Sequence, residues 1–267
     1  MPDSPTARAR IDWGDLARRE PFDRDFGGGR GRPIDRHYID AFLDANRGAI
    51  RGHVLEVGDD HYARRFGGAQ VHAVDVVDHV QTPNTTIFGD LSDSVTLPPA
   101  RFDCIICTQT LHLLFDVHAT LANLHRALVV GGVLLVTVPG ISQIVRYDMA
   151  RWGDFWRFTT YGLETLLRDA GFEVVRIDAR GGLFTFLGHQ LSLPIVGLTL
   201  GIPVLGRLIY HVVAISVVRP SLFLDRVLPG SAKFAAGYAV VARRRDGSAP
   251  RAPGCRSSAR TRAVAGI

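Results

Sequence analysis

The chain has 267 residues, 46% of them hydrophobic and 21% charged, which is enough for one large domain with a buried core. Its formal net charge is +5, but residues 243–267 contain seven arginines and one aspartate, so the remainder of the chain is close to neutral. This distribution argues against a basic nucleic-acid-binding face on the fold. It predicts instead a disordered basic tail over residues 244–267.

The cysteines and the N-terminal residues bear on the cellular compartment. Cys104 and Cys107 form a CxxC pair inside the apolar run FDCIICT, with no second pair, so we expect buried strand residues rather than a disulfide framework. The scattered histidines lack metal-ligand spacing, and we expect no metal site. Residues 1–15 carry no apolar stretch after their charges, unlike a secretory signal. These features predict a reducing, cytoplasmic location.

The elements follow in chain order. Residues 1–33 carry mixed charges and a glycine run, which predicts a flexible arm, and an amphipathic helix follows from Asp35. Helical patterns recur at 117–132, which Gly131 and Gly132 would end, and at 161–170, which Gly171 would close. Apolar, largely β-branched runs typical of strands lie at 53–58, 71–77, 85–90, 102–108, 132–139, 172–179 and 237–245.

This alternation predicts an α/β fold: a doubly wound, Rossmann-like, mostly parallel seven-stranded sheet with helices on both faces. The predicted domain covers residues 34–243, with the last strand suited to an antiparallel edge of the sheet. Residues 183–229 are almost uncharged and rich in proline and glycine, which indicates an apolar helical C-terminal insertion. The insertion would serve as a lid or dimer surface, and the alternative is peripheral membrane contact through 183–217.

The first strand ends in Glu56-Val57-Gly58, where a glycine lets a ligand approach the backbone. Asp75 is predicted to end the second strand, about 20 residues further on, where a carboxylate can accept the hydroxyls of a ribose. Asp90 and Leu91 follow the third strand and could border an adenine.

These motifs, taken together, resemble class I S-adenosylmethionine-dependent methyltransferases, and within them the methyltransferase type 11 domain family. The likeness covers residues 53–178 in order and rests on VLEVG, AVDVV, GDL, FDCIICTQTLHLL and LVVGGVLLVTVPG. The resemblance implies S-adenosylmethionine as the cofactor and transfer of its methyl group. By the same resemblance, the cofactor-binding residues would be Glu56, Gly58, Asp59, Asp75, Asp90, Leu91, Thr108 and Gln109.

The turn after the first strand departs from the family pattern. Asp59 and Asp60 stand where further glycines are usual. Two carboxylates would repel a dinucleotide pyrophosphate but tolerate a cationic sulfonium ligand, so the turn disfavours NAD. The other interpretation is that both aspartates cap the short helix HYARRF.

The segment 141–167 would face the acceptor. Its predicted substrate residues are Tyr147, Trp152, Trp156 and Arg157, because aromatic rings stack on sugars and guanidinium groups bind phosphate or carboxylate. The alternative is a purely structural role, in which the tryptophans pack the loop on the sheet while Arg157 pairs with Asp154. The candidate general bases are His112, Asp148 and Asp154.

The sequence therefore predicts a methyltransferase that acts on a small-molecule or glycan-like acceptor, most simply by O-methylation. The competing hypotheses are a non-catalytic Rossmann-like binding module in a glycan-assembly complex and, more weakly, an NAD-dependent enzyme. The methyltransferase hypothesis requires donor binding that depends on Glu56 and Asp75, and the binding-module hypothesis does not.

Overall fold

The computed structural model describes residues 34–142, 153–199, 208–209, 211–228, 234–245 and 247. They belong to two compact units. We call residues 39–140, 144–179 and 237–267 the sheet unit, and residues 1–38, 141–143 and 180–236 the helical unit. Each unit is described by itself.

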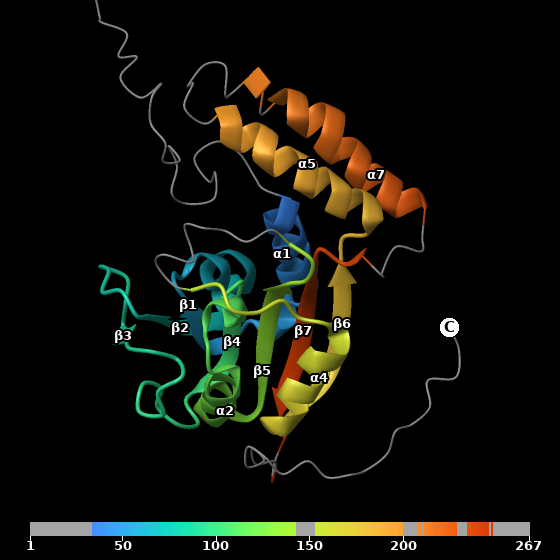
Figure 1. The fold of residues 1–267 in the computed structure, drawn as a ribbon. Coiled ribbons are helices and arrows are strands. Elements are labelled where there is room, and N and C mark those ends of the chain that lie inside the picture. Colours follow the sequence, from blue (N-terminus) through green and yellow to red (C-terminus); the bar gives the residue numbers. More distant parts are fainter. Residues whose placement is uncertain are drawn as a thin grey trace, which may run out of the picture. The chain divides into compact units, whose positions relative to one another are not determined.

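The sheet unit is built on seven strands in the order β3-β2-β1-β4-β5-β7-β6 (Figure 1). The pairs β1–β2, β1–β4, β2–β3 and β4–β5 are parallel, whereas β5 and β7 are antiparallel. This arrangement confirms the predicted doubly wound, mostly parallel sheet. The strands are β1 (Gly52–Val57), β2 (Val71–Asp78), β3 (Ile87–Phe88), β4 (Phe102–Thr108), β5 (Leu128–Pro139), β6 (Phe172–Arg180) and β7 (Gly237–Arg244).

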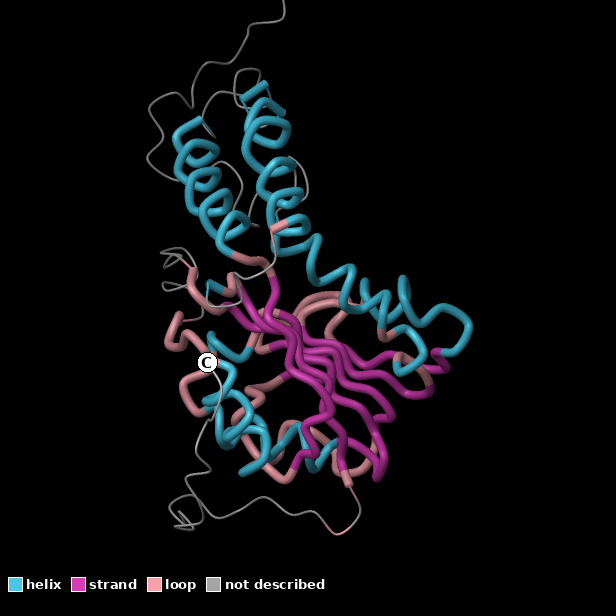
Figure 2. The backbone as a smooth tube through the Cα atoms, turned by 90° about the vertical axis from the view of Figure 1, so that its right-hand side faces the viewer, coloured by secondary structure: helices cyan, strands magenta, loops and turns pink. Residues whose placement is uncertain are grey.

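Alternate residues of the central strands enter two separate cores, one on each face of the sheet. Val54, Ile106 and Leu135 pack with Phe42 of the helix α1 (Ile34–Ala45). Their neighbours along the strands pack with α2 (Val117–Ala127) and α4 (Thr160–Asp169). Both faces are therefore covered by helices, as the uninterrupted apolar strands predict, and Figure 2 shows the twisted sheet between them.

Short helical turns join these elements. They are η2 (Arg47–Ala49), η3 (Ala63–Gly67), η4 (Gly68–Gln70) and η5 (Leu111–Leu113). The two longer helices on one face begin at side-chain caps, since Asp116 accepts a hydrogen bond from the Ala119 amide and Thr159 accepts one from Gly162. Gly171, at φ +92°, follows the end of α4, as predicted.

Two expectations about the sheet were wrong. The helix α2 ends at Ala127, and Leu128 already pairs with Phe102 as the start of β5. The register between β4 and β5 then shifts before Cys104 meets Val133, so Gly131 and Gly132 shape a bulge rather than stop a helix. In addition, β7 lies between β5 and β6 rather than at an edge, because strand neighbours depend on long-range pairing that local patterns do not encode.

The paired cysteines are buried strand residues, as predicted. Cys104 and Cys107 are both unexposed, and they belong to the cores on opposite faces of the sheet. Burial raises the pKa of the Cys107 thiol to about 12 and that of Cys104 further still. The two sulfur atoms therefore cannot bind one metal ion together.

The helical unit contains α5 (Leu183–Thr199), η6 (Ala214–Val218) and α7 (Arg219–Val227). Figures 1 and 2 show α5 lying along η6 and α7, which it contacts. This confirms an apolar helical insertion. Within the described ranges, no helix combines the length and the hydropathy needed to cross a membrane.

Candidate active site

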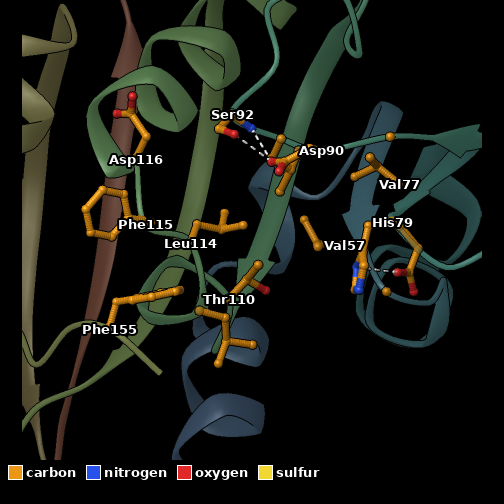
Figure 3. Close-up of a pocket in the computed structure, with 15 residues that line it drawn as sticks. Val57, Val77, His79, Asp90, Ser92, Thr110, Leu114, Phe115, Asp116 and Phe155 are labelled. Atoms are coloured by element: carbon orange, nitrogen blue, oxygen red, sulfur yellow. Dashed lines mark hydrogen bonds and ion pairs between the residues drawn. The ribbon is translucent and has the colours of Figure 1, made fainter. Parts of the chain in front are cut away.

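A cavity of about 510 Å³ lies at the carboxyl ends of β1 and β2 (Figure 3). It stands beside the point where the strand order reverses between β1 and β4, which is where open α/β sheets bind ligands. The residues that line it are Val57, Gly58, Val77, Asp78, His79, Gly89, Asp90, Leu91, Ser92, Thr110, Leu113, Leu114, Phe115, Asp116 and Phe155.

Gly58 forms the turn that the first strand makes at this cavity. Its φ of +92° favours glycine, and its amide donates to the Val77 carbonyl at 3.0 Å. Apart from its two chain neighbours, no described residue has an atom within 4 Å of a Cβ placed on Gly58. The glycine is therefore needed for its backbone conformation, and it leaves the space above the turn open to a ligand.

Three carboxylates on the cavity wall are held in the same way. Oδ1 of Asp78 accepts from the Val80 amide at 2.9 Å, Oδ1 of Asp90 from the Ser92 amide at 2.8 Å, and Oδ1 of Asp116 from the Ala119 amide at 2.9 Å. Within the described part of the chain, Oδ2 of each has no protein hydrogen-bond partner. The three carboxylates are thus oriented in advance, each with an oxygen available to a ligand.

The charge of the cavity is one-sided. Its described lining holds three carboxylates and no lysine or arginine. Such a site repels polyphosphates and suits a ligand with hydroxyl groups or positive charge.

One end of the cavity is aromatic. Phe115 and Phe155 line it with ring centroids 5.4 Å apart in an edge-to-face arrangement. The Trp156 ring lies 6.4 Å from that of Phe115 and is 42% exposed. These rings present an apolar surface for stacking next to the charged part of the cavity.

Asp75 does not lie at the end of the second strand, and that expectation was wrong. The strand β2 continues to Asp78, and Asp75 pairs with Leu55 within the sheet. Its carboxylate binds His53 Nε2 at 2.9 Å and an Arg101 guanidinium nitrogen at 2.9 Å, and it is absent from the cavity wall. Asp78 lies 20 residues after Gly58, a spacing that could have identified it from the sequence.

Glu56 caps the turn rather than lining the cavity. It is 1% exposed, and its two oxygens accept from the amides of Tyr62 at 3.0 Å and Ala63 at 2.7 Å. Burial raises the pKa of Glu56 to about 8, although these two hydrogen bonds oppose the shift. The carboxyl group thus fixes the first turn after β1.

Asp59 and Asp60 make contacts within the turn and the helix that follows it. Asp59 is exposed, accepts from the His61 amide at 3.1 Å and does not line the cavity. Asp60 forms an ion pair with Arg64 one helical turn further on, and its carbonyl accepts from the Arg64 amide. The amides of Tyr62 and Ala63 at the start of the helix donate to Glu56, so neither aspartate caps the helix with its side chain.

The strand-end residues divide between the cavity and its support. Asp90 and Leu91 line the cavity, as expected for residues bordering an adenine. Thr108 and Gln109 do not line it: the Gln109 amide donates to the Thr137 carbonyl at 2.8 Å, with φ +49° at Gln109. Thr110 reaches the cavity in their place.

The segment that follows β5 docks on the loop after β4. The amides of Phe155 and Trp156 donate to the His112 carbonyl at 2.8 and 3.3 Å, and Trp156 Nε1 donates to the Leu114 and Phe115 carbonyls. Arg157 forms a two-pronged ion pair with Asp154, whose side chain is 2% exposed. This matches the alternative for Arg157, whereas Trp156 is 42% exposed and lies on the loop after β4 rather than on the sheet. Tyr147, Asp148 and Trp152 lie outside the described residues.

His112 is buried beside that ion pair. Among the described residues its Nδ1 has no hydrogen-bond partner, and burial lowers the pKa of His112 to about 4. The imidazole is therefore neutral at pH 7, and it does not line the cavity. Among the residues that the structure describes, no group of histidine, cysteine or acidic side chains could hold a metal ion.

Sequence reasoning missed several residues of the cavity wall. Phe115, Asp116 and Phe155 belong to loops that only the fold brings together. Asp116 nevertheless stands directly before the helical pattern at 117, which is the signature of a capping residue at the carboxyl edge of the sheet.

A family model described as a methyltransferase domain matches residues 25–177, more than half of the chain. The chain belongs to this family and is an S-adenosylmethionine-dependent methyltransferase. This confirms the class I resemblance and the cofactor, and it sets aside the binding-module and NAD hypotheses. No sequence among the curated proteins matches the chain.

Solved structures share the fold at low identity. A Galdieria sulphuraria protein, provisionally described as a sarcosine dimethylglycine methyltransferase, is 14% identical with a TM-score of 0.51, over 79% of this chain and 87% of that one. Phosphoethanolamine N-methyltransferase 2 of Haemonchus contortus, in complex with S-adenosyl-L-methionine, is 12% identical with a TM-score of 0.50, over 82% and 55%. These similarities support the seven-stranded methyltransferase fold alone.

Proposed function

We propose that the enzyme transfers a methyl group from S-adenosylmethionine to a hydroxyl oxygen of a small, uncharged or glycan-like acceptor. The observation that carries this is the cavity at the strand reversal, with three oriented carboxylates and no described lysine or arginine at one end and exposed aromatic rings at the other.

For the donor, we assign the ribose to Asp78 and the adenine to Asp90 and Leu91. Asp78 ends the strand β2, and its Oδ2 has no protein partner in the described chain. Gly58 lets the methionine part of the donor approach the backbone closely, and Glu56 holds the turn by accepting a hydrogen bond from the Tyr62 amide. When bound, the donor supplies an electrophilic methyl group on a positively charged sulfur. The carboxylates attract that positive charge, whereas they would repel a pyrophosphate.

For the acceptor, the aromatic end supports a sugar-like or otherwise neutral compound. Rings such as those of Phe115 and Phe155 stack on the C–H faces of sugars. Arg157, which we expected to bind an anionic group, is instead paired with Asp154. No other described arginine or lysine reaches the cavity, so an anionic acceptor has no counter-charge there.

For the proton of the hydroxyl group, Asp116 is the best-placed described carboxylate. Asp154 is committed to Arg157, and His112 does not line the cavity, so neither can reach a hydroxyl group bound there. Asp148 lies outside the described residues. Asp116 lines the cavity next to Phe115, with Oδ1 fixed by the Ala119 amide, so its second oxygen can accept the proton.

Calorimetric titration tests the donor assignment. S-adenosylhomocysteine should bind wild-type protein, and Asp78→Asn should weaken binding by about tenfold or more, because a hydrogen bond to a charged group contributes about 1.5–3 kcal/mol. The matched control is Asp75→Asn, whose partners His53 and Arg101 do not line the cavity, and it should bind nearly as wild type. If Asp75→Asn loses the ligand while Asp78→Asn keeps it, the assignment fails.

Transfer of a labelled methyl group tests the acceptor. Neutral saccharides and alcohols should be methylated in preference to sugar phosphates and amines. Phe155→Ala should raise KM for the acceptor, whereas Asp116→Asn, which keeps the helix cap, should lower kcat with little change in KM. Methylation of amines alone would overturn the oxygen assignment.

A further inference from the structure

The two helical segments of the helical unit place small residues inside and aliphatic residues outside. On α5, Thr185, Gly188 and Ser192 follow a spacing of three and four residues, and all three are buried. Among the α5 residues whose side chains the structure describes, the exposed ones recur every four residues and are large and apolar: Leu187 at 45%, Leu191 at 57% and Ile195 at 38% exposure. A helix that packs in water normally buries its large apolar side chains and exposes its small and polar ones.

The second segment, residues 211–227, which includes η6 and α7, also exposes large apolar side chains, although Val213 is buried at 5% exposure. Ser221 is buried against α5 at 9% exposure. The large apolar side chains of the segment that stand exposed are Val212 at 54%, Ile215 at 60%, Phe223 at 63% and Val227 at 52%.

The contact between the two segments explains why small residues lie inside. A Cβ on Gly188 would come within 2.2 Å of Ser221 Oγ and 2.8 Å of its Cβ, so only glycine allows this approach. Close packing of glycine and hydroxyl residues is typical of helices in lipid, where burying apolar side chains between helices brings no advantage. The packing therefore fits surroundings that are apolar.

The exposed charge on this helix pair is basic. Asp225, the acidic residue of α7, is turned inward, where it accepts hydrogen bonds from the amides of Gly182, Phe184 and Thr185 at the start of α5. Arg219 and Arg226 are exposed on the same helix as Phe223 and Val227. A second copy of this face would bring like charges together, whereas anionic lipid headgroups would complement them.

We propose that α5 and residues 211–227 dock in the plane of an anionic membrane surface. The aliphatic side chains of both segments enter the boundary between headgroups and acyl chains, and the two arginines contact lipid phosphates. The α5 helix contains no charged residue, which suits shallow insertion along its exposed stripe. This inference concerns the helical unit and does not rest on the proposed acceptor.

Vesicle flotation of the full chain tests the proposal. Vesicles of phosphatidylcholine mixed with phosphatidylglycerol should carry the protein upward, and vesicles of phosphatidylcholine alone should carry less. The double variant Leu191→Glu/Phe223→Glu should lose at least about tenfold in vesicle binding, because two buried apolar contacts are replaced by charges. The matched control is Val95→Glu, at an 83% exposed aliphatic residue of the sheet unit, which should bind as wild type.

The basic tail requires its own control, because seven arginines in residues 243–267 also attract anionic vesicles. At about 1 M salt, where charges more than about 3 Å apart are screened, apolar insertion should persist in the wild type and be absent from the double variant. Arg219→Glu/Arg226→Glu should reduce the preference for anionic vesicles, and the part that remains is the contribution of the tail. Each variant must still bind S-adenosylhomocysteine, which separates loss of docking from loss of folding.

Three outcomes would overturn the proposal. The first is that wild-type protein does not float with either vesicle. The second is that the double variant floats as well as wild type, which assigns binding to the tail. The third is that the protein sediments as a dimer which Leu191→Glu/Phe223→Glu dissociates, with no vesicle binding, which makes the apolar face an interface between two copies.

Discussion

At the residue scale, Gly58 meets two requirements: its backbone has a positive φ, and it has no side chain that would enter the cavity. We expect Gly58→Ala to lower the free energy of unfolding by about 1–2 kcal/mol, since a Cβ is disfavoured at positive φ. The same substitution should weaken S-adenosylhomocysteine binding, because the added Cβ points into space that no protein atom occupies within 4 Å. Urea denaturation and calorimetry measure the two effects.

Gly131 offers the matched control for this prediction. It has φ +81°, an added Cβ there also meets nothing within 4 Å, and it lies in β5 away from the cavity wall. Gly131→Ala should cost similar stability but leave ligand affinity unchanged. If both variants lose affinity equally, the effect of Gly58→Ala comes from general strain rather than from the cavity.

The buried thiols give a second prediction at this scale. In a Cys255→Ser background, Cys104 and Cys107 are the remaining thiols, and both are unexposed with raised pKa. Because the thiolate is the reactive species, they should react with a thiol reagent only as fast as the fold opens. Absorbance at pH 8 should therefore show no fast phase without urea and complete reaction in denaturing urea. A fast phase in native buffer would contradict the buried placement.

At the element scale, the segment 153–159 depends on the Asp154–Arg157 pair. Asp154→Asn should destabilise the protein by about 2 kcal/mol, because it leaves a largely buried guanidinium without its countercharge. The control is Glu164→Gln, which breaks the exposed pair with Arg168 on α4 and should cost about 0.5 kcal/mol or less. Urea denaturation compares the two, and equal losses would contradict the structural role of Asp154.

The elements also show what a sequence can and cannot predict. Strands such as β4 and β6 match their predicted ranges closely, because β4 is a mostly apolar run and β6 is rich in β-branched residues that follow the glycine at the end of a helix. The start of β5 was misjudged, since a pair of glycines after a helix can serve as a stop or as a bulge. Asp75 and Asp78 both interrupt one apolar run, and only the pairing of β2 with β1 and β3 shows which of them ends the strand.

The site itself required the fold. Gly58, Asp90 and Leu91 were predicted from a strand end and the residues that follow it, which local patterns locate well. Phe115 and Phe155 come from loops 40 residues apart in sequence, and their contact depends on hydrogen bonds to the His112 carbonyl. From the sequence, α5 and residues 211–227 were recognisable only as an apolar stretch. The solvent exposure of their side chains, which the sequence does not give, decides between a lid and a docking surface.

At the scale of the whole molecule, three buried titratable groups determine how stability varies with pH. Burial lowers the pKa of His112 and of His125 to about 4 each, from an ordinary value of 6.5. Burial raises the pKa of Glu56 to about 8, from 4.5. The histidines therefore stabilise the fold above pH 6.5 and lose that contribution as the pH falls toward 4. Glu56 stabilises the fold below pH 4.5 and loses its contribution as the pH rises toward 8.

These opposing contributions predict a maximum of stability near pH 6.5. Between pH 4.5 and 6.5 the unfolded chain takes up two protons on the histidines while the folded chain retains one on Glu56, so stability should rise by up to about 1.4 kcal/mol per pH unit. Between pH 6.5 and 8 Glu56 acts alone and stability should fall at a similar rate. Urea denaturation across this range measures the curve. Glu56→Gln should remove the alkaline decline, and His125→Gln should flatten the acid limb. A wild-type curve that still rises from pH 6.5 to 8 would show that Glu56 is ionised in the folded protein, with its two amide hydrogen bonds outweighing its burial.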